Sequence, residues 1–181
     1  MTIEETKLKG CYIIKPQIFK DKRGYFVENY NQNSFNTALG LEVNFVQDNE
    51  SQSSKGVLRG LHYQLGKYAQ AKLVRVIKGK VLDVVVDVRP NSSTFGEHIS
   101  VELSEANKTQ LFVPRGFAHG FLVMEDETIF SYKCDNFYNK NSEAGIIYND
   151  EDLGIDWKYP KQELIISEKD LILPNFKNAR L

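Results

Sequence analysis

Short runs of alternating apolar and polar residues dominate the chain, and they predict strands. β-Branched and aromatic residues recur in these runs, and Gly, Pro, Asn and Ser separate them. A turn around Gly79 joins two of the runs, which predicts a β-hairpin. Many short strands at this spacing favour a jelly roll, in which two packed sheets close most of their edges. The expected strands are Cys11–Ile14, Tyr25–Tyr30, Val43–Gln47, Val57–Gln64, Lys72–Ile77, Val81–Val88, His98–Leu103, Gln110–Pro114, His119–Met124 and Thr128–Cys134.

Helical periodicity is almost absent. It is confined to Asn33–Leu41, which ends near Gly40, and to an acidic turn after Asn149. No internal repeat, low-complexity block or linker interrupts the pattern, so we expect a single domain over residues 1–181.

The composition removes several classes of function. Charged residues make up 26% of the chain, hydrophobic residues make up 41%, and the net charge is −1. This balance indicates neither disorder nor a membrane or nucleic-acid protein. The first residues carry no apolar leader and no stretch is long and apolar enough to span a membrane, so we expect a cytoplasmic location. Cys11 and Cys134 lie in strand patterns and are expected to be small buried hydrophobes rather than a disulfide or a zinc pair.

Three polar side chains interrupt apolar strand faces: Lys72, Asp83 and Tyr132. Lys72 shares a face with Val74 and Val76, so its ammonium is expected to point into the barrel, where an unpaired lysine is rare. Each residue also has an ordinary structural interpretation. Lys72 could snorkel to the barrel mouth, Tyr132 could be a core aromatic with its hydroxyl at the rim, and Asp83 could face outward or accept a structural hydrogen bond.

The run Val57–Gln64 places Arg59 and His62 in one apolar strand. Strict alternation sends these two side chains to opposite faces, so both can serve one pocket only if Gly60 forms a bulge or one of them works from the rim. The histidines are widely spaced and His62-Tyr63-Gln64 lacks an H-x-H pair, which argues against a metal. Phosphate-binding glycine loops are also absent, so discrete side chains would have to hold any nucleotide.

Several motifs occur together in one order along the chain: Asp21-Lys-Arg-Gly-Tyr-Phe, Phe45-Val-Gln-Asp-Asn, Val57-Leu-Arg-Gly-Leu-His-Tyr-Gln, Ala71-Lys-Leu-Val-Arg, Val113-Pro-Arg-Gly-Phe-Ala-His-Gly-Phe, Tyr132-Lys, Tyr148-Asn-Asp and Gly154-Ile-Asp-Trp. Through these motifs the chain resembles the dTDP-4-dehydrorhamnose 3,5-epimerase family almost from end to end. The resemblance implies a metal-free, cofactor-free jelly roll of the cupin type that forms a homodimer, with N-terminal strands exchanged between subunits. It also implies the isomerase step that precedes the final reduction in dTDP-L-rhamnose synthesis.

By this resemblance His62 is the base and Tyr132 the proton donor of an epimerisation that proceeds through an enolate. Lys72 faces the C4 oxygen of the 4-keto sugar and stabilises its developing charge. Asp170 is the expected partner that orients the His62 ring, and Asp83 is a second choice because it lies within a strand.

The binding residues are likewise implied by similarity. Arg23, Arg59 and Lys169 resemble diphosphate contacts, and Phe26 and Tyr138 resemble a pair that stacks on thymine. If N-terminal strands are exchanged, Arg23, Phe26 and Glu28 could reach the neighbouring subunit's pocket. The residues that resemble polar contacts to nucleotide and sugar are Glu28, Gln47, Asn49, His119 and Glu143.

Three other functions remain open at this stage. A relative could invert only C3 or only C5, although Tyr132 favours the full reaction. A 3,4-ketoisomerase on a related jelly roll would give a 3-keto product. A non-catalytic binding module for nucleotide sugars is a third alternative, against which the coincidence of base, acid and cation argues.

Overall fold

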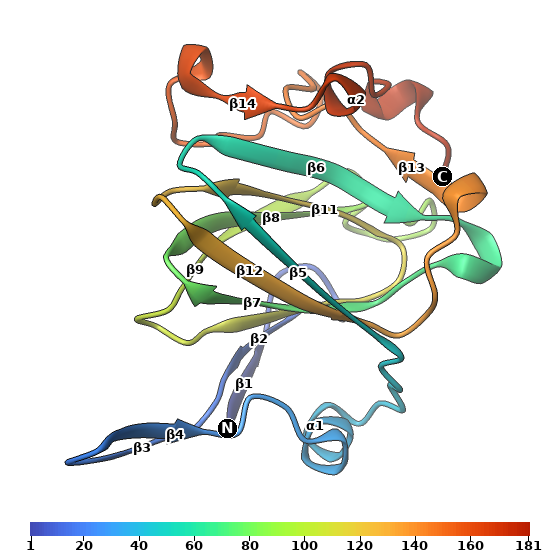
Figure 1. Cartoon of the computed structure of the whole chain (residues 1–181). Coiled ribbons are helices and arrows are strands. Elements are labelled where there is room, and N and C mark those ends of the chain that lie inside the picture. The colour runs from blue at the N-terminus through green and yellow to red at the C-terminus, as the bar shows by residue number, and fades with distance from the viewer.

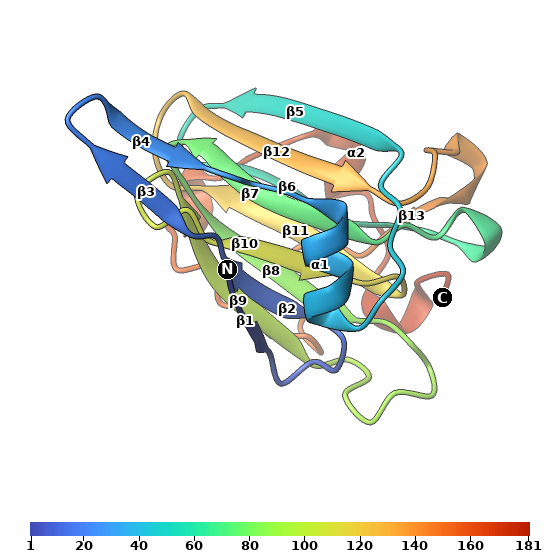
Figure 2. The same cartoon turned by 90° about the horizontal axis from the view of Figure 1, so that it is seen from below.

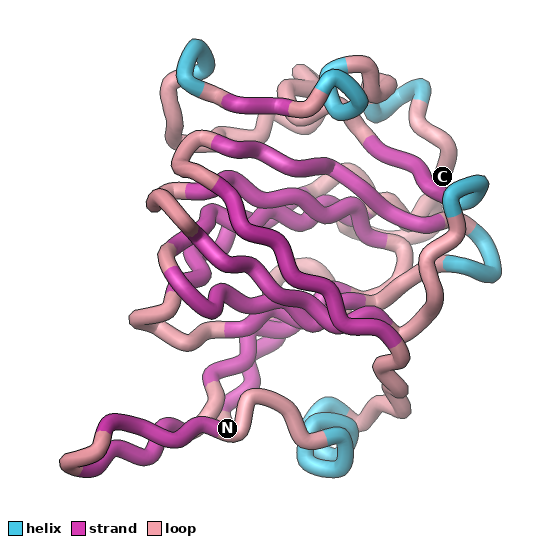
Figure 3. The backbone as a smooth tube through the Cα atoms, in the orientation of Figure 1, coloured by secondary structure: helices cyan, strands magenta, loops and turns pink.

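Two antiparallel sheets packed face to face form the body of the protein. The computed structural model describes residues 1–181, and strands account for most of its regular structure (Figure 1, Figure 3). This sandwich is the all-β jelly roll that the strand pattern predicts. The first sheet has the order β1 (Thr2–Glu5), β2 (Tyr12–Lys15), β10 (Gln110–Val113), β7 (Lys72–Lys78), β12 (Thr128–Cys134) and β5 (Gln47–Ser53).

The second sheet has the order β13 (Glu143–Gly145), β6 (Val57–Gln64), β11 (Phe117–Val123), β8 (Lys80–Asp87) and β9 (His98–Ser104). A short strand, β14 (Ile165–Ile166), pairs in parallel with the start of β6. The remaining elements are the hairpin β3 (Ile18–Asp21) with β4 (Gly24–Val27), the helices α1 (Gln32–Leu39) and α2 (Glu168–Leu171), and the 3-10 turns η1 (Gly66–Tyr68), η2 (Lys140–Ser142), η3 (Lys161–Glu163) and η4 (Phe176–Asn178).

Three apolar clusters hold these layers together. The central one lies between the sheets and includes Val74, Val85 and Phe130. A second cluster covers the outer face of the second sheet with the C-terminal segment, which contributes Trp157. A third packs Phe35 of α1 against the outer face of the first sheet (Figure 2). Both outer faces are therefore partly covered, which explains why so many strands are apolar on both sides.

Helix α1 follows the predicted pattern closely. Asn31 caps its first turn by accepting a hydrogen bond from Ser34 N, and Gly40 ends it with a left-handed φ of 64°. The acidic segment after Asn149, which we expected to be helical, instead forms turns. There Asp150 accepts hydrogen bonds from the backbone N–H groups of Leu153 and Phe176. Its side chain thus offers the backbone an alternative to a helix.

Two strand predictions were wrong in an informative way. The segments on either side of Gly79 do not form a hairpin, because β7 pairs with β10 and β12 whereas β8 pairs with β9 and β11. The turn at Gly79 instead carries the chain from one sheet to the other. The strand expected at Val43–Gln47 begins only at Gln47 and continues to Ser53.

The bulge suggested for Gly60 is present. His119 pairs with His62 and Phe121 pairs with Arg59, so β6 uses one residue more than β11 between these pairs. Gly60 has φ 124°, and a Cβ there would lie 2.6 Å from Gly120 Cα. Only glycine fits this close approach.

The β3–β4 hairpin projects from the body and makes its regular pairing only within itself (Figure 1). Phe19, Tyr25 and Phe26 on it are all more than half exposed. None of the helices combines the length and the apolar composition that crossing a lipid bilayer requires.

Candidate active site

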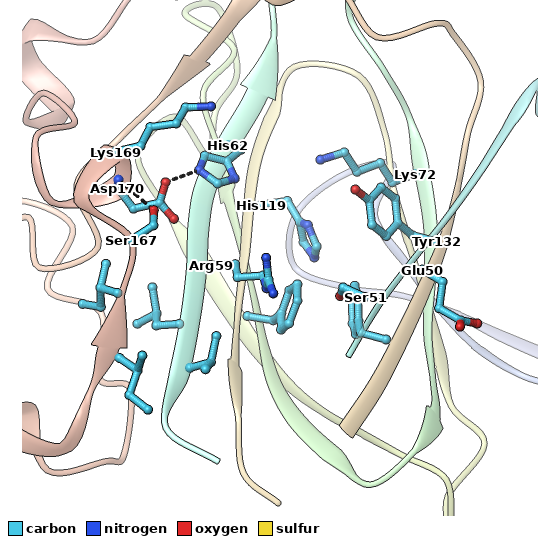
Figure 4. Close-up of a pocket in the computed structure, with 16 residues that line it drawn as sticks. Glu50, Ser51, Arg59, His62, Lys72, His119, Tyr132, Ser167, Lys169 and Asp170 are labelled. Carbon is cyan, nitrogen blue, oxygen red and sulfur yellow. Dashed lines mark hydrogen bonds and ion pairs between the residues drawn. The ribbon is translucent and has the colours of Figure 1, made fainter. Parts of the chain in front are cut away.

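A cavity of about 530 Å³ opens between the two sheets and is closed on one side by the C-terminal segment. Figure 4 shows His62 and Arg59 on β6 at one side, Lys72 and Tyr132 at the other, and His119 between them. The bulge at Gly60 explains how Arg59 and His62 can share this cavity despite their odd spacing. The lining residues are Glu50, Ser51, Val57, Leu58, Arg59, His62, Lys72, His119, Phe121, Phe130, Tyr132, Ile165, Ile166, Ser167, Lys169 and Asp170.

His62 is held by Asp170. The ring nitrogen Nε2 lies 2.7 Å from Asp170 Oδ1, and the other carboxylate oxygen accepts a hydrogen bond of 3.2 Å from Gly60 N. Burial raises the pKa of Asp170, but hydrogen bonds from His62, Gly60 and Ser167 outweigh it and hold that pKa below its usual value. The ionised carboxylate can only accept, so Nε2 carries a proton and Nδ1 is the nitrogen free to act as a base (Figure 4).

Lys72 enters the cavity from the start of β7. Its Nζ lies 5.7 Å from the centroid of the Tyr132 ring, and no hydrogen bond or ion pair engages it. Burial lowers the pKa of the ammonium, whereas the negative charges of Asp83 and Glu143 favour its charged form. Burial raises the pKa of the Tyr132 phenol, which therefore stays protonated. A cation and a proton donor thus lie side by side across from His62.

Asp83 does not orient His62, which corrects the second choice made from the sequence. Asp83 is fully buried, and its two oxygens lie 2.9 and 3.0 Å from His119 Nε2. Burial raises the pKa of Asp83, against the opposing effects of His119 and Lys72. The alternation of β8 does turn Asp83 inward, but its register places it opposite Phe121 of β11, within reach of His119 rather than of His62.

A second cavity of about 320 Å³ adjoins the first. His62, Lys72 and Tyr132 are the three residues that line both cavities, so they stand at the boundary between them. The second cavity also gathers four of the predicted polar and stacking residues, namely Gln47, Asn49, Tyr138 and Glu143.

Glu143 links two segments at the mouth of these cavities. It accepts a hydrogen bond of 3.0 Å from the Tyr138 hydroxyl and forms an ion pair with Lys169 of α2. Burial raises the pKa of Glu143, but the contacts with Lys169 and Tyr138 outweigh it and lower that pKa overall. The carboxylate is therefore ionised and connects the loop after β12 to the C-terminal segment.

Three predicted residues lie away from both cavities in this chain. Arg23 and Phe26 belong to the projecting β3–β4 hairpin, where Arg23 pairs with Asp21 at 2.6 Å. Glu28 follows that hairpin and lines neither cavity. Phe26 and Tyr138, expected to form one stacking pair, are therefore not brought together within a single chain.

Other lining residues were not predicted from the sequence, among them Glu50 and Ser51 on β5. Its inward positions are Gln47, Asn49, Ser51 and Ser53, which alternate with more exposed neighbours. Ser51 lines the main cavity, and its hydroxyl is buried without a hydrogen-bond partner. Gln47 and Asn49 were predicted by resemblance, but the alternation of polar residues that also turns Ser51 and Ser53 inward was not recognised, because strands were sought among apolar residues.

The structure gathers no group of three or more His, Cys, Asp or Glu side chains that could hold a metal ion. Three side chains that line the main cavity carry a positive charge, namely Arg59, Lys72 and Lys169. Side chains of this type bind anionic oxygens by direct hydrogen bonds.

Comparison with known proteins adds independent findings. Residues 5–178 match the family model described as dTDP-4-dehydrorhamnose 3,5-epimerase. The enzyme of that name from Shigella flexneri is 50% identical over 179 residues, which cover 99% of this chain and 98% of the relative. The crystal structure of the Elizabethkingia anophelis enzyme of the same name superposes with a TM-score of 0.95 at 58% identity, covering 98% of this chain and 97% of the other.

A further solved structure contains a ligand. It is the dTDP-6-deoxy-D-glucose-3,5-epimerase of Legionella pneumophila in complex with dTDP-4-keto-L-rhamnose, with a TM-score of 0.94 and 44% identity. The superposition covers 98% of this chain and 93% of that one.

Proposed function

The chain belongs to the dTDP-4-dehydrorhamnose 3,5-epimerase family, and on that premise we propose how its own residues carry out the isomerase reaction. The enzyme inverts C3 and C5 of dTDP-4-dehydro-6-deoxy-D-glucose and yields dTDP-4-dehydro-L-rhamnose. Substrate and product are isomers, so the chemistry consists of proton transfers at carbons next to the C4 ketone. Such transfers require a base, an acid on the opposite face of the sugar, and a positive group near the ketone oxygen.

The observation that carries this assignment is the meeting of His62, Lys72 and Tyr132 at the boundary of the two cavities. His62 Nδ1 removes the proton from a carbon beside the ketone, and the electron pair moves onto the C4 oxygen. The Lys72 ammonium stabilises the resulting enolate, a contribution of about 3–4 kcal/mol for one well-placed donor. Tyr132 then protonates the same carbon from the opposite face.

One inversion leaves His62 protonated and Tyr132 deprotonated. Both groups must exchange protons with water before the second carbon reacts, which is possible because the cavity is open to solvent and the His62 side chain is 31% exposed. Because substrate and product are isomers, the proposed reaction needs no redox cofactor, and the Lys72 ammonium supplies the charge stabilisation that a metal ion could otherwise provide.

Binding of the nucleotide is proposed to use both cavities. Tyr138 stacks on thymine at the second cavity, where Gln47, Asn49 and Glu143 supply polar contacts. In the main cavity Arg59 and Lys169 contact the diphosphate, and His119 contacts the sugar side of the substrate. The positive side chains of the main cavity support this division, because phosphate oxygens prefer arginine and lysine.

We further propose that the whole chain is one domain that forms a homodimer through its N-terminal strands. The shared core between the two sheets supports a single domain. The exposed aromatic residues of the β3–β4 hairpin support the dimer, because a projecting apolar hairpin needs a partner surface. In such a dimer Arg23, Phe26 and Glu28 of one subunit complete the substrate site of the other.

A cytoplasmic location is also part of the proposal. Cys11 and Cys134 are both free thiols in the structure, which is the usual state of cysteines in a reducing compartment.

The decisive experiment follows turnover of dTDP-4-keto-6-deoxyglucose in D₂O by NMR, with and without a chelator. We expect deuterium at both C3 and C5 and no loss of rate on chelation. Label at a single carbon would identify a single-centre epimerase, and binding without any label would identify a non-catalytic module. A 3-keto product would identify a ketoisomerase.

A further inference from the structure

Arg59 is held in the main cavity by a residue that has no assigned role. Ser53, the last residue of β5, is 9% exposed, and its Oγ accepts hydrogen bonds from Arg59 Nε at 3.3 Å and from Arg59 NH2 at 3.0 Å. These two donors form one edge of the guanidinium plane. The other edge, formed by NH1 and NH2 at the end of the side chain, is left free to bind an anion. Figure 4 shows the guanidinium turned toward the interior of the pocket.

No carboxylate competes for this guanidinium. Arg59 takes part in none of the ion pairs of the structure, so its charge is not neutralised by the protein. A serine hydroxyl is neutral and therefore orients the side chain without cancelling the charge that attracts an anion. An aspartate at the same place would orient Arg59 equally well but would compete with phosphate for it.

The benefit of this arrangement is preorganisation. A free arginine side chain loses up to about 2 kcal/mol of rotamer entropy when a ligand fixes it. A side chain already fixed by Ser53 loses less on binding, so more of its interaction with an anion appears as affinity.

We propose that Ser53 is a positioning residue for diphosphate binding, which it serves by holding the Arg59 guanidinium in its binding orientation. The inference rests on the proposed function, because it takes Arg59 to contact the diphosphate of the substrate. Ser53 itself touches neither the sugar nor the reacting atoms. Arg59 binds the diphosphate in the ground state and the transition state alike, so its position governs KM rather than kcat.

The test measures the affinity of dTDP and of thymidine by calorimetry for the Ser53→Ala variant. We expect the affinity for dTDP to fall about fivefold and the affinity for thymidine, which lacks phosphate, to stay the same. Turnover should show a similar rise in KM with kcat within about twofold of the parent. Ser53→Thr keeps the hydroxyl and should restore most of the dTDP affinity. The matched control is Gln52→Ala, because Gln52 is exposed and points away from the cavity.

A double-mutant cycle with Arg59→Ala shows whether Ser53 acts through Arg59. In the Arg59→Ala background, replacement of Ser53 by Ala should cause no further loss of dTDP affinity. Three results would each overturn the proposal. The first is that Ser53→Ala costs as much dTDP affinity in the Arg59→Ala background as in the parent. The second is that Ser53→Ala lowers the affinity for thymidine as much as that for dTDP, and the third is that it leaves the dTDP affinity unchanged. If Arg59→Ala alone left the dTDP affinity unchanged, Arg59 would not bind the diphosphate, and the proposed role of Ser53 would be contradicted as well. Isotope exchange at C3 and C5 tests the proposed reaction separately.

Discussion

Asp170 Oδ1 lies 2.7 Å from His62 Nε2, although 108 positions separate the two residues in the chain. The short helix α2 places the carboxylate there, and Ser167 caps that helix by accepting a hydrogen bond from Asp170 N at 3.2 Å. The second carboxylate oxygen is occupied by Gly60 N. The carboxylate is thus fixed from two sides, and it determines which nitrogen of His62 is free.

Replacement of Asp170 by Asn should lower kcat by about 10²-fold or more, because an amide can hold the imidazole in the wrong tautomer. Affinity for dTDP should change little. Steady-state turnover and calorimetry on the same preparation measure both quantities. Glu168→Gln, two residues earlier on α2 and exposed, is the matched control. A rate within about threefold of the parent for Asp170→Asn would remove the carboxylate from the mechanism.

The pH dependence of kcat should report Lys72 on its alkaline side. Burial holds the pKa of Lys72 below 10.5, whereas burial raises the pKa of Tyr132 above 10.0. Lys72 should therefore lose its proton at a lower pH than an ordinary lysine, and kcat should fall as it does so, whereas Tyr132 keeps its proton to a higher pH than an ordinary tyrosine. In Lys72→Arg the guanidinium stays charged, so the alkaline fall should move to higher pH whatever the absolute rate. An unchanged alkaline limb in this variant would assign the fall to another group.

Replacement of Tyr132 by Phe removes the proposed acid but leaves the base. His62 should still remove protons reversibly, so NMR in D₂O should show exchange with retention of configuration while inverted product forms about 10²-fold more slowly. The control is Tyr68→Phe, outside both cavities. Formation of inverted product at the parental rate would show that another group supplies the proton.

The hairpin proposal predicts complementation between two inactive variants. Arg23→Ala damages the site of the partner subunit, whereas His62→Ala damages the subunit's own site. After dissociation and random reassociation, each mixed dimer has one intact site, so activity should return to about one quarter of the parental level. Each variant treated alone should stay inactive. If the mixture also remained inactive although mass spectrometry detected mixed dimers, Arg23 would not act across the interface.

Asp87 is predicted to stabilise the fold without acting in catalysis. Burial alone would raise its pKa, but hydrogen bonds from Arg89, Ser92 and Thr94 lower it to about 2 from the ordinary 3.8. A depressed pKa means that the folded state favours the ionised carboxylate. The stabilisation is therefore complete above about pH 4 and is lost as the pH falls through about 2.

Asp87→Asn should accordingly lower the free energy of unfolding by about 2 kcal/mol at pH 7, and the difference should shrink between pH 4 and pH 2. Urea denaturation at several pH values measures it. The exposed Asp152, whose side chain has no hydrogen-bond partner, gives the control variant Asp152→Asn. A difference that stays constant down to pH 2 would contradict the assigned pKa.

The sequence by itself determined which residues could carry the chemistry. Side-chain alternation within a strand is a local property, so it placed Lys72 and Tyr132 on inward faces before any partner strand was known. For Arg59 and His62 to share one pocket, their odd spacing required either a bulge at Gly60 or a rim position for one of them, and the structure has the bulge. The similarity of motifs along the chain gave the family.

The tertiary structure decided which of these residues meet, because strand partners and chain crossings depend on contacts distant in sequence. Alternation turned Asp83 inward but could not show that His119 of the adjacent strand would bind it. It also could not show that β7 and β8 enter different sheets, since a glycine turn permits either path. The alternating polar run of β5 is present in the sequence, but only the packing of the two sheets showed that Ser51 lines the cavity and that Ser53 binds Arg59.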